Sequence, residues 1–373
     1  MGRIFIILVV AMVPIGLYMY FFIKRIFATF NARVEKKSIK ILIIAASVCL
    51  AAMCINIFSV TAIIVLHIVV AAMAVQFVNF IVKKIAGEKY NALNIWKKLY
   101  GSGIIPLLIS AVLLIWGYLN MMNVTETDYT IYTDKSIREE GYRTALIADI
   151  HFGVSVDIEE LRQKCDEISG KNLDIVVLCG DIVDENTGKE DMEKVFEALG
   201  TIESTYGTYF VYGNHDRQPY SDNKLYTERE LENAISRAGI TILSDETYTI
   251  NNEFTIVGRE DASITGDSGR KTISELLDNE DMDNFILVLD HKPTEYKENS
   301  EAGSDLILSG HTHAGQIWPA NILFQIMKFD DAVYGYTKIN DTQALVTSGF
   351  AGWGYPIKTS APAEYVIIDI KPR

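Results

Sequence analysis

Five short groups of Asp, His and Asn residues stand out in the C-terminal two-thirds of the 373-residue chain, because each follows an apolar run. A single group of this kind is usually a turn with a capping Asp. Five groups, each at the end of a predicted strand, instead indicate one shared site. They are D-x-H at Asp149–His151, G-D-x-x-D at Gly180–Asp184, G-N-H-D at Gly213–Asp216, H-x-P at His291–Pro293 and G-H-T-H at Gly310–His313.

The side chains of these groups are suitable ligands for divalent cations. Carboxylate, imidazole and amide donors together suit Mn, Fe or Zn, and the lack of thiolates in the groups argues against an iron–sulfur site. The set is too large for one four-coordinate ion, whereas two ions sharing a carboxylate would use every member. We predict two divalent ions, with Mn²⁺ favoured, bound by Asp, His and Asn side chains of these five groups.

The elements that position these residues follow from the apolar patterning. Short β-branched runs predict buried strands at residues 144–148, 174–178, 208–212, 285–289 and 305–309. Amphipathic stretches between them predict helices at residues 157–169, 190–199 and 227–238. Strands that alternate with helices predict an α/β domain, with ligands bound beyond the carboxyl ends of the strands.

The first 122 residues have a different chemistry from the rest. They contain 12 Lys and Arg residues and 2 acidic residues, a net charge of +10, which leaves 22 basic and 46 acidic residues and a net charge of −24 for the remainder. The acidic part has no cluster of cations, so nucleic acid is not an expected partner. Apolar stretches predict a bundle of four transmembrane helices, at about residues 4–23, 41–60, 62–82 and 104–122.

The basic residues of this part lie mainly between the first and second and between the third and fourth predicted spans. The positive-inside rule places both loops in the cytoplasm, so both termini and the C-terminal domain are expected outside, on a multi-pass protein of the cell membrane. A cleaved signal peptide is the alternative for the first span, although its apolar region would be shorter than 20 residues.

As an ordered set, the five motifs resemble those of the calcineurin-like metallophosphoesterase family, over about Tyr142 to Lys371. The segments Ser309–Gln316 and Gly349–Pro356 resemble the bacterial membrane-associated YkuE-like branch, which is related to UDP-2,3-diacylglucosamine hydrolases. Ala314 stands where that branch often has Gly, and many relatives have one span instead of four. The resemblance implies a four-layer αββα sandwich for residues 142–373. The sequence pattern places a short strand-like linker before it, at residues 123–141.

The resemblance also implies individual roles for the site residues. Asp181 would bridge the two metal ions, and a hydroxide between ions about 3.5–4 Å apart would attack phosphorus. His215 would protonate the leaving group, while Asp184 and the second catalytic candidate, Asp216, would orient ligands or His215. The remaining ligands divide into one set for each metal: Asp149, His151 and His313, and Asn214, His291 and His311.

Two functions of different classes are consistent with the sequence. The first is a membrane-anchored phosphohydrolase acting on a phosphate mono- or diester, with lipid-linked phosphates or pyrophosphates among its candidate substrates. The second is a non-catalytic metal-binding sensor or scaffold at the membrane.

Four large apolar residues follow the last metal motif: Trp318, Phe324, Ile326 and Met327. Core packing is the favoured interpretation, and a substrate lip or contact with lipid is the alternative.

Overall fold

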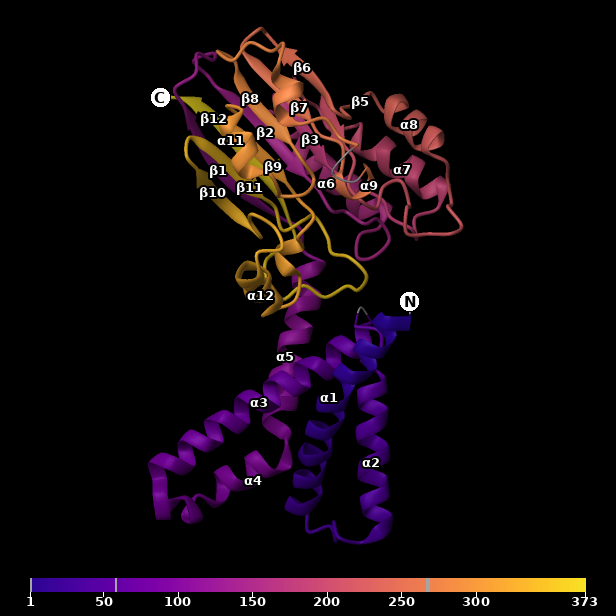
Figure 1. Cartoon of the computed structure of the whole chain (residues 1–373), viewed down its shortest axis with the longest axis vertical. Coiled ribbons are helices and arrows are strands. Elements are labelled where there is room, and N and C mark those ends of the chain that lie inside the picture. The colour runs from indigo at the N-terminus through magenta and orange to yellow at the C-terminus, as the bar shows by residue number, and fades with distance from the viewer. Residues whose placement is uncertain (1, 58, 266–268) are drawn as a thin grey trace. The chain divides into compact units, whose positions relative to one another are not determined.

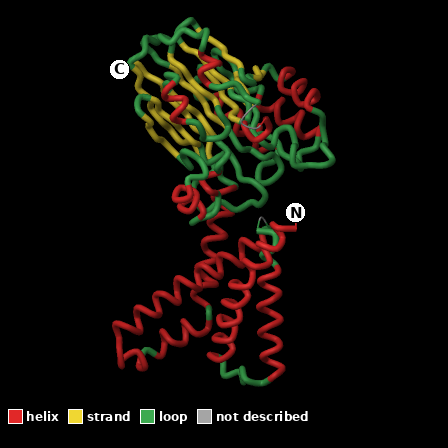
Figure 2. The backbone as a smooth tube through the Cα atoms, viewed as in Figure 1, coloured by secondary structure: helices red, strands yellow, loops and turns green. Residues whose placement is uncertain are grey.

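The computed structural model describes residues 2–57, 59–265 and 269–373. The chain divides into two compact units, Met1–Trp116 and Gly117–Arg373. Figure 1 labels their helices and strands, and Figure 2 separates the helical unit from the unit that contains the sheets. We describe each unit by itself.

The first unit is helical. Its elements, together with the helix that continues into the second unit, are α1 (Gly2–Thr29), α2 (Lys37–Ala52), α3 (Val60–Ala86), the 3₁₀ helix η1 (Gly87–Ala92), α4 (Asn94–Ser102) and α5 (Ile104–Met121). Among the described residues, three stretches are long and apolar enough to cross a membrane: Met12–Thr29, Val60–Ala92 and Ile104–Met121. They correspond to the first, third and fourth predicted spans.

The second predicted span, residues 41–60, differs from the structure. Helix α2 already ends at Ala52, and α3 begins after Ser59, whose side chain accepts a hydrogen bond from the Ala62 amide as a helix cap. The 16 residues of α2 rise about 24 Å, which is less than the roughly 30 Å of a hydrocarbon core. The structure therefore supports three candidate spans, and a bundle of four stays a prediction.

The second unit contains two six-stranded mixed sheets. The first sheet has the order β1-β12-β2-β3-β4-β5 and the second β10-β11-β9-β8-β7-β6. Strands β2 to β5 are parallel neighbours in the first sheet, as are β7, β8, β9 and β11 in the second. The strands are β1 (Thr125–Thr133), β2 (Tyr142–Ile147), β3 (Ile175–Cys179), β4 (Thr208–Val211), β5 (Ile240–Ile242), β6 (Glu246–Ile250), β7 (Phe254–Gly258), β8 (Phe285–Leu289), β9 (Leu306–Ser309), β10 (Gly335–Ile339), β11 (Thr342–Val346) and β12 (Glu364–Pro372).

Three buried clusters divide this unit into four layers. One cluster joins α6 (Ile158–Ser169), α7 (Lys189–Leu199) and α8 (Glu228–Arg237) to the outer face of the first sheet. A second lies between the sheets, and a third joins the second sheet to α10 (Ile273–Leu277) and α11 (Tyr296–Glu301). The α/β domain, the five strands and the three helices are thus confirmed, with ends that differ by at most two residues, and the clusters agree with the expected αββα layering. The remaining elements are α9 (Ala262–Thr265), η2 (His313–Gly315) and α12 (Ala320–Met327).

The segment expected to be a strand-like linker, residues 123–141, contains a strand that belongs to the first sheet. Strand β1 pairs in parallel with β12 over nine positions, from Thr125 opposite Glu364 to Thr133 opposite Pro372. Its acidic residues make it a poor candidate for a buried strand, but β1 is the outer strand of its sheet, and only two of its nine residues are buried. The sheet unit therefore begins before Tyr142.

Candidate metal centre

The five motifs converge because the strands that precede them are parallel neighbours. Strands β2, β3 and β4 lie side by side and lead to Asp149, Asp181 and Asn214; β8 and β9 lie side by side in the other sheet and lead to His291 and His311. The carboxyl ends of parallel strands meet at one edge of a sheet. The two edges supply donors to the same region, since His291 Nε2 lies 3.1 Å from Asp181 Oδ2.

The backbone at these strand ends adopts conformations that non-glycine residues rarely have. The φ angles are 56° at Asp149, 40° at His151, 53° at Asp181, 70° at His311 and 48° at His313. Left-handed backbone costs free energy for residues with a Cβ and concentrates at functional sites. Here it turns consecutive donor side chains out of the strand direction and into the site.

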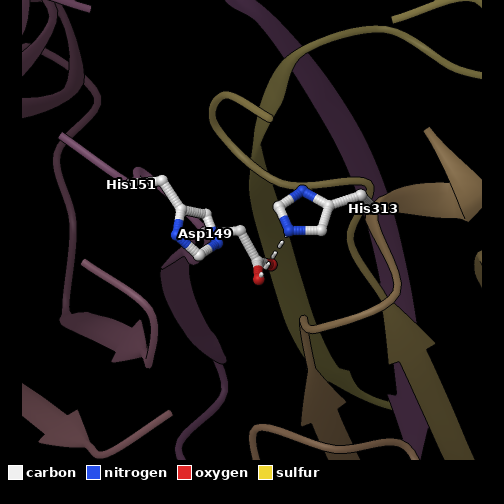
Figure 3. A group of neighbouring side chains, drawn as sticks. All are labelled: Asp149, His151 and His313. Atoms are coloured by element: carbon white, nitrogen blue, oxygen red, sulfur yellow. Dashed lines mark ion pairs between the residues drawn. The ribbon is translucent and has the colours of Figure 1, made fainter. Parts of the chain in front are cut away.

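Two groups of donor atoms result. Asp149, His151 and His313 form one group, drawn in Figure 3, and Asp181, His291 and His311 form the other; within each group the ligand atoms lie within 4.8 Å of one another. His313 Nε2 is 3.6 Å from Asp149 Oδ1. His151 Nε2 is also 3.6 Å from Asp181 Oδ2, so Asp181 approaches donors of both groups.

The donors fit divalent ions because several of them are buried and have no hydrogen-bond partner among the described residues. These atoms are both ring nitrogens of His151, Nε2 of His291, Nδ1 of His313 and Oδ1 of Asn214. All four residues are at most 8% exposed. A buried polar atom without a partner costs free energy, which coordination to a cation would recover. The mixture of carboxylate, imidazole and amide suits the predicted class of metal, while the metal's identity and the ligand assignment stay predictions.

The charges of the cluster also favour bound cations. Burial raises the pKa of Asp149 to about 6, and the charge of Asp181 adds to the effect. Burial acts in the same direction on Asp181, but the adjacent His291 and His151 outweigh it and hold its pKa well below the usual range. Carboxylates crowded into a space without solvent repel each other, so a divalent ion between them would stabilise their charged forms.

Hydrogen bonds behind the donors fix their orientation. His291 Nδ1 is 2.8 Å from the carbonyl oxygen of Cys179; because a carbonyl only accepts, Nδ1 carries the proton and Nε2 is left to bind a metal. The Asp149 carboxylate accepts the backbone N–H of His311 at 3.0 Å. Donor residues from the two sheets are thereby linked.

Asp216 contacts the backbone rather than His215. Its carboxylate accepts hydrogen bonds from the N–H groups of Asp181 at 2.9 Å, Ile182 at 2.9 Å, Val183 at 3.3 Å and Gly213 at 2.6 Å. It therefore joins the loop after β3 to the loop after β4. The expectation that Asp216 orients a ligand agrees with its bond to the backbone of Asp181, while a catalytic role for it stays a prediction.

The side-chain partner of His215 is Glu185, a residue that the sequence motifs did not single out. His215 Nδ1 is 2.7 Å from Glu185 Oε2, whereas Asp184, one of the expected partners, lies 3.6 Å from His151 Nδ1. Burial favours neutral His215, but the bond to Glu185 and the charge of Asp181 outweigh it and raise its pKa. Only the position of Glu185 directly after G-D-x-x-D could have suggested it.

The segment Gly349–Pro356 lies directly behind the first donor group. The N–H of Ala351 donates to the backbone oxygen of Asp149 at 3.1 Å. The ammonium group of the fully buried Lys358 donates to the carbonyl oxygens of Ser348, Gly349 and Ala351. Burial lowers the pKa of Lys358 to about 7. This lysine thus shapes the loop against which Asp149 rests.

Comparison with known families agrees with this geometry. Residues 142–315 match the family model described as calcineurin-like phosphoesterase. Over these residues the chain is similar to calcineurin-like phosphoesterases. Both donor groups lie within the matched residues.

Relatives with similar sequences include proteins of bacteria and animals. A metallophosphoesterase of Helicobacter pylori strain J99 is 28% identical over 250 residues, covering 65% of this chain and 63% of that protein. A transmembrane protein with metallophosphoesterase domain of Danio rerio is 27% identical, covering 72% of this chain and 62% of that protein. The metallophosphoesterase YkuE of Bacillus subtilis is 24% identical, covering 68% of this chain and 88% of that protein. The chain thus spans less than two-thirds of the length of the first two relatives.

Among solved structures, a dimetal phosphatase from Danio rerio covers 56% of this chain and 87% of its own, with 13% identity and a TM-score of 0.38. A likeness of this size supports no conclusion beyond the ones drawn from the sequence matches. The relation to UDP-2,3-diacylglucosamine hydrolases stays a prediction.

We predict that replacing Asp216 by Ala weakens metal binding. The four N–H groups that the carboxylate accepts would lose their partner, and the Asp181 backbone would no longer be fixed. Residues that orient ligands typically contribute about 10–100-fold to metal affinity. Titration of the metal-free full-length protein with Mn²⁺ in a calorimeter measures the change; Asp283→Ala, at an exposed turn, is the control and should bind as the original protein does. Equal affinities for both variants would contradict this role.

We also predict that Glu185→Gln lowers kcat about 10–100-fold with little change in KM, since Glu185 positions His215 and belongs to neither donor group. Glu185→Asp should restore part of the lost rate, because it keeps the carboxylate. Steady-state hydrolysis of a chromogenic phosphoester at saturating Mn²⁺ gives both constants. A loss of the same size in both variants would point to a structural role instead.

Proposed function

We propose that this chain is a membrane-anchored, metal-dependent phosphohydrolase that cleaves a phosphate mono- or diester. The observation that carries the proposal is the pair of buried donor groups with partnerless ring nitrogens at the meeting edges of the two sheets. Such sites serve phosphoester hydrolysis when two ions bind about 3.5–4 Å apart. The match of residues 142–315 to a phosphoesterase family supports the same reaction.

Two divalent ions held by Asp149, His151 and His313 and by Asn214, His291 and His311, with Asp181 between them, would supply an activated water and neutralise phosphoryl charge. The residues of the chain complete the chemistry. The Glu185 carboxylate occupies His215 Nδ1, so Nε2 is the ring nitrogen that faces a substrate. A protonated His215 would donate that proton to the leaving oxygen, or to a phosphoryl oxygen as charge develops.

Membrane anchoring rests on the three long apolar helices and on the transmembrane protein among the relatives. The side on which the phosphoesterase domain lies depends on α2. If α2 crosses the bilayer, four spans place the basic loops around residues 24–40 and 83–98 on one side, in agreement with the positive-inside rule, and the domain outside. If α2 does not cross, these loops lie on opposite sides. We propose the first arrangement, in which both loops are cytoplasmic.

The substrate is proposed as a class. Attachment to a bilayer favours a phosphoester of an amphiphile, such as a lipid-linked phosphate or pyrophosphate, because tethering raises the effective concentration of a reactant held on the same surface. The expected relation to UDP-2,3-diacylglucosamine hydrolases belongs to this proposal.

Hydrolysis by the purified full chain tests the reaction. With Mn²⁺ present we expect release of p-nitrophenol from p-nitrophenyl phosphate or its bis ester, and loss of this activity in Asp181→Ala and His291→Ala. Asp283→Ala, at an exposed turn on the amino-terminal side of β8, should be unaffected. Tight metal binding without turnover on a broad phosphoester panel would reject the enzyme and favour the sensor or scaffold.

Cysteine labelling of intact cells tests the orientation. Among the described cysteines only Cys49 is exposed, so Cys49→Ser removes the background and Asp283→Cys places one reactive thiol on the domain surface. An extracytoplasmic domain reacts with a membrane-impermeant maleimide before lysis. Labelling only after lysis would show that the domain is cytoplasmic and would reject the proposed orientation.

A further inference from the structure

Helix α12 carries an unusual amount of exposed apolar surface. Its eight residues are all described, and none of them is buried. Ile326 is 71% exposed, Met327 59% and Trp318 50%, so the favoured expectation of core packing is wrong at these three positions. We define the α12 patch as the exposed apolar side chains on and beside the helix: Trp318, Ile322, Leu323, Ile326, Met327 and Phe329. A contiguous patch of this kind usually marks an interaction site.

The patch is mounted on a rigid base. The Trp318 N–H donates to Thr359 Oγ1 at 2.9 Å, and the Thr359 N–H donates to the carbonyl oxygen of Gln316 at 2.8 Å. The buried Gln316 amide donates to the carbonyl oxygens of Trp353 and Ile357 at 3.1 and 3.2 Å. These bonds fix the position at which the α12 segment leaves the domain.

The same base holds the C-terminal turn of α5, which belongs to this unit of the structure. The Lys358 N–H donates to the carbonyl oxygen of Gly117 at 3.0 Å. The Asn120 side-chain amide donates to the carbonyl oxygens of Lys358 and Ala361 at 2.9 and 2.7 Å. Figure 1 shows α12 and the end of α5 together at one end of the sheet unit. The patch and the end of a candidate membrane span are therefore attached to one segment, residues 357–361.

We propose that the α12 patch inserts into the lipid bilayer surface, at the boundary between headgroups and acyl chains. The proposal rests on the membrane anchoring given above. A span that ends near Met121 places the bilayer surface at the level of that helix end, which is where α12 is fixed. An eight-residue helix is about 12 Å long, and an interfacial helix needs to bury its apolar face only about 5–10 Å deep.

The net charge of the chain after residue 122 favours the apolar part of the bilayer as the partner of the α12 patch. The sequence after residue 122 has a net charge of 22 − 46 = −24, so anionic headgroups repel it. Attraction must come from apolar contact, which does not require anionic lipid. A second copy of the chain would bring two such acidic surfaces together and is disfavoured for the same reason.

The α12 patch lies close in sequence to the donor groups, so its position bears on the route by which a substrate would reach them. The metal-ligand motif at His311–His313 leads through η2 into Trp318 and α12, with four residues between His313 and Trp318. A seated patch would hold the donor groups at a fixed height above the bilayer. Phosphoesters embedded in that surface would then meet the site without leaving the lipid.

Fluorescence quenching on the full chain in phosphatidylcholine nanodiscs tests the proposal. In the Cys49→Ser background, single cysteines at Ile326→Cys, Val112→Cys and Tyr248→Cys carry an environment-sensitive fluorophore. Val112 is an exposed residue of α5 and Tyr248 an exposed residue of β6, which Figure 1 places at the end of the domain remote from α12. Doxyl groups on the acyl chains should quench the probes at positions 326 and 112, and aqueous iodide should quench the probe at position 248.

Each other outcome has a definite meaning. Iodide quenching at position 326 with doxyl quenching at 112 would overturn the α12 proposal and leave membrane anchoring intact. Protection from both quenchers at 326 would show that protein, such as a second copy, covers the patch. No doxyl quenching at 112 would reject membrane anchoring itself. Leu323→Cys, at the neighbouring exposed position, repeats the measurement should Ile326→Cys fold poorly.

Discussion

The arrangement of the donor groups depends on one buried carboxylate that binds only backbone. Asp216 accepts hydrogen bonds from four N–H groups of two loops. If the ends of β3 and β4 moved apart, these buried N–H groups would lose their acceptor. Its own pKa is raised to about 6, chiefly by burial. Burying this acid costs free energy, but its hydrogen bonds fix the geometry of the two loops. That geometry determines the position of Asp181.

Hydrogen bonds between carboxylates and backbone amides also explain why the two sheets form one site. Asp149, at the end of β2, accepts the His311 amide that follows β9, and the His215 amide donates to Asp181 Oδ1 at 2.8 Å. The carboxylates of Asp149 and Asp181 thus accept hydrogen bonds from the backbone and also belong to the two donor groups. Two ions would complete a network that is already ordered by backbone bonds, a form of preorganisation that keeps the reorganisation needed on binding small.

Much of the sheet unit could be predicted from sequence, because buried strands are continuous apolar runs and the donors come directly after them. Three features could not. The pairing of strand β1 was hidden because its partner, β12, lies more than 200 residues away in the sequence. Glu185 meets His215 only through the path of the loop after β3. The pattern of α12 is apolar in the way of a core helix, since periodicity reports hydrophobicity and not whether protein or lipid will cover it.

Lys358 contacts both the end of α5 and the loop beside Asp149. Its backbone N–H holds the helix end at Gly117, and its ammonium group holds the carbonyl oxygens beside Asp149, so a single residue joins the end of the helix to the loop of the first donor group. Were this helix held in a bilayer, as proposed above, encounters with substrates in the same surface would become a two-dimensional search.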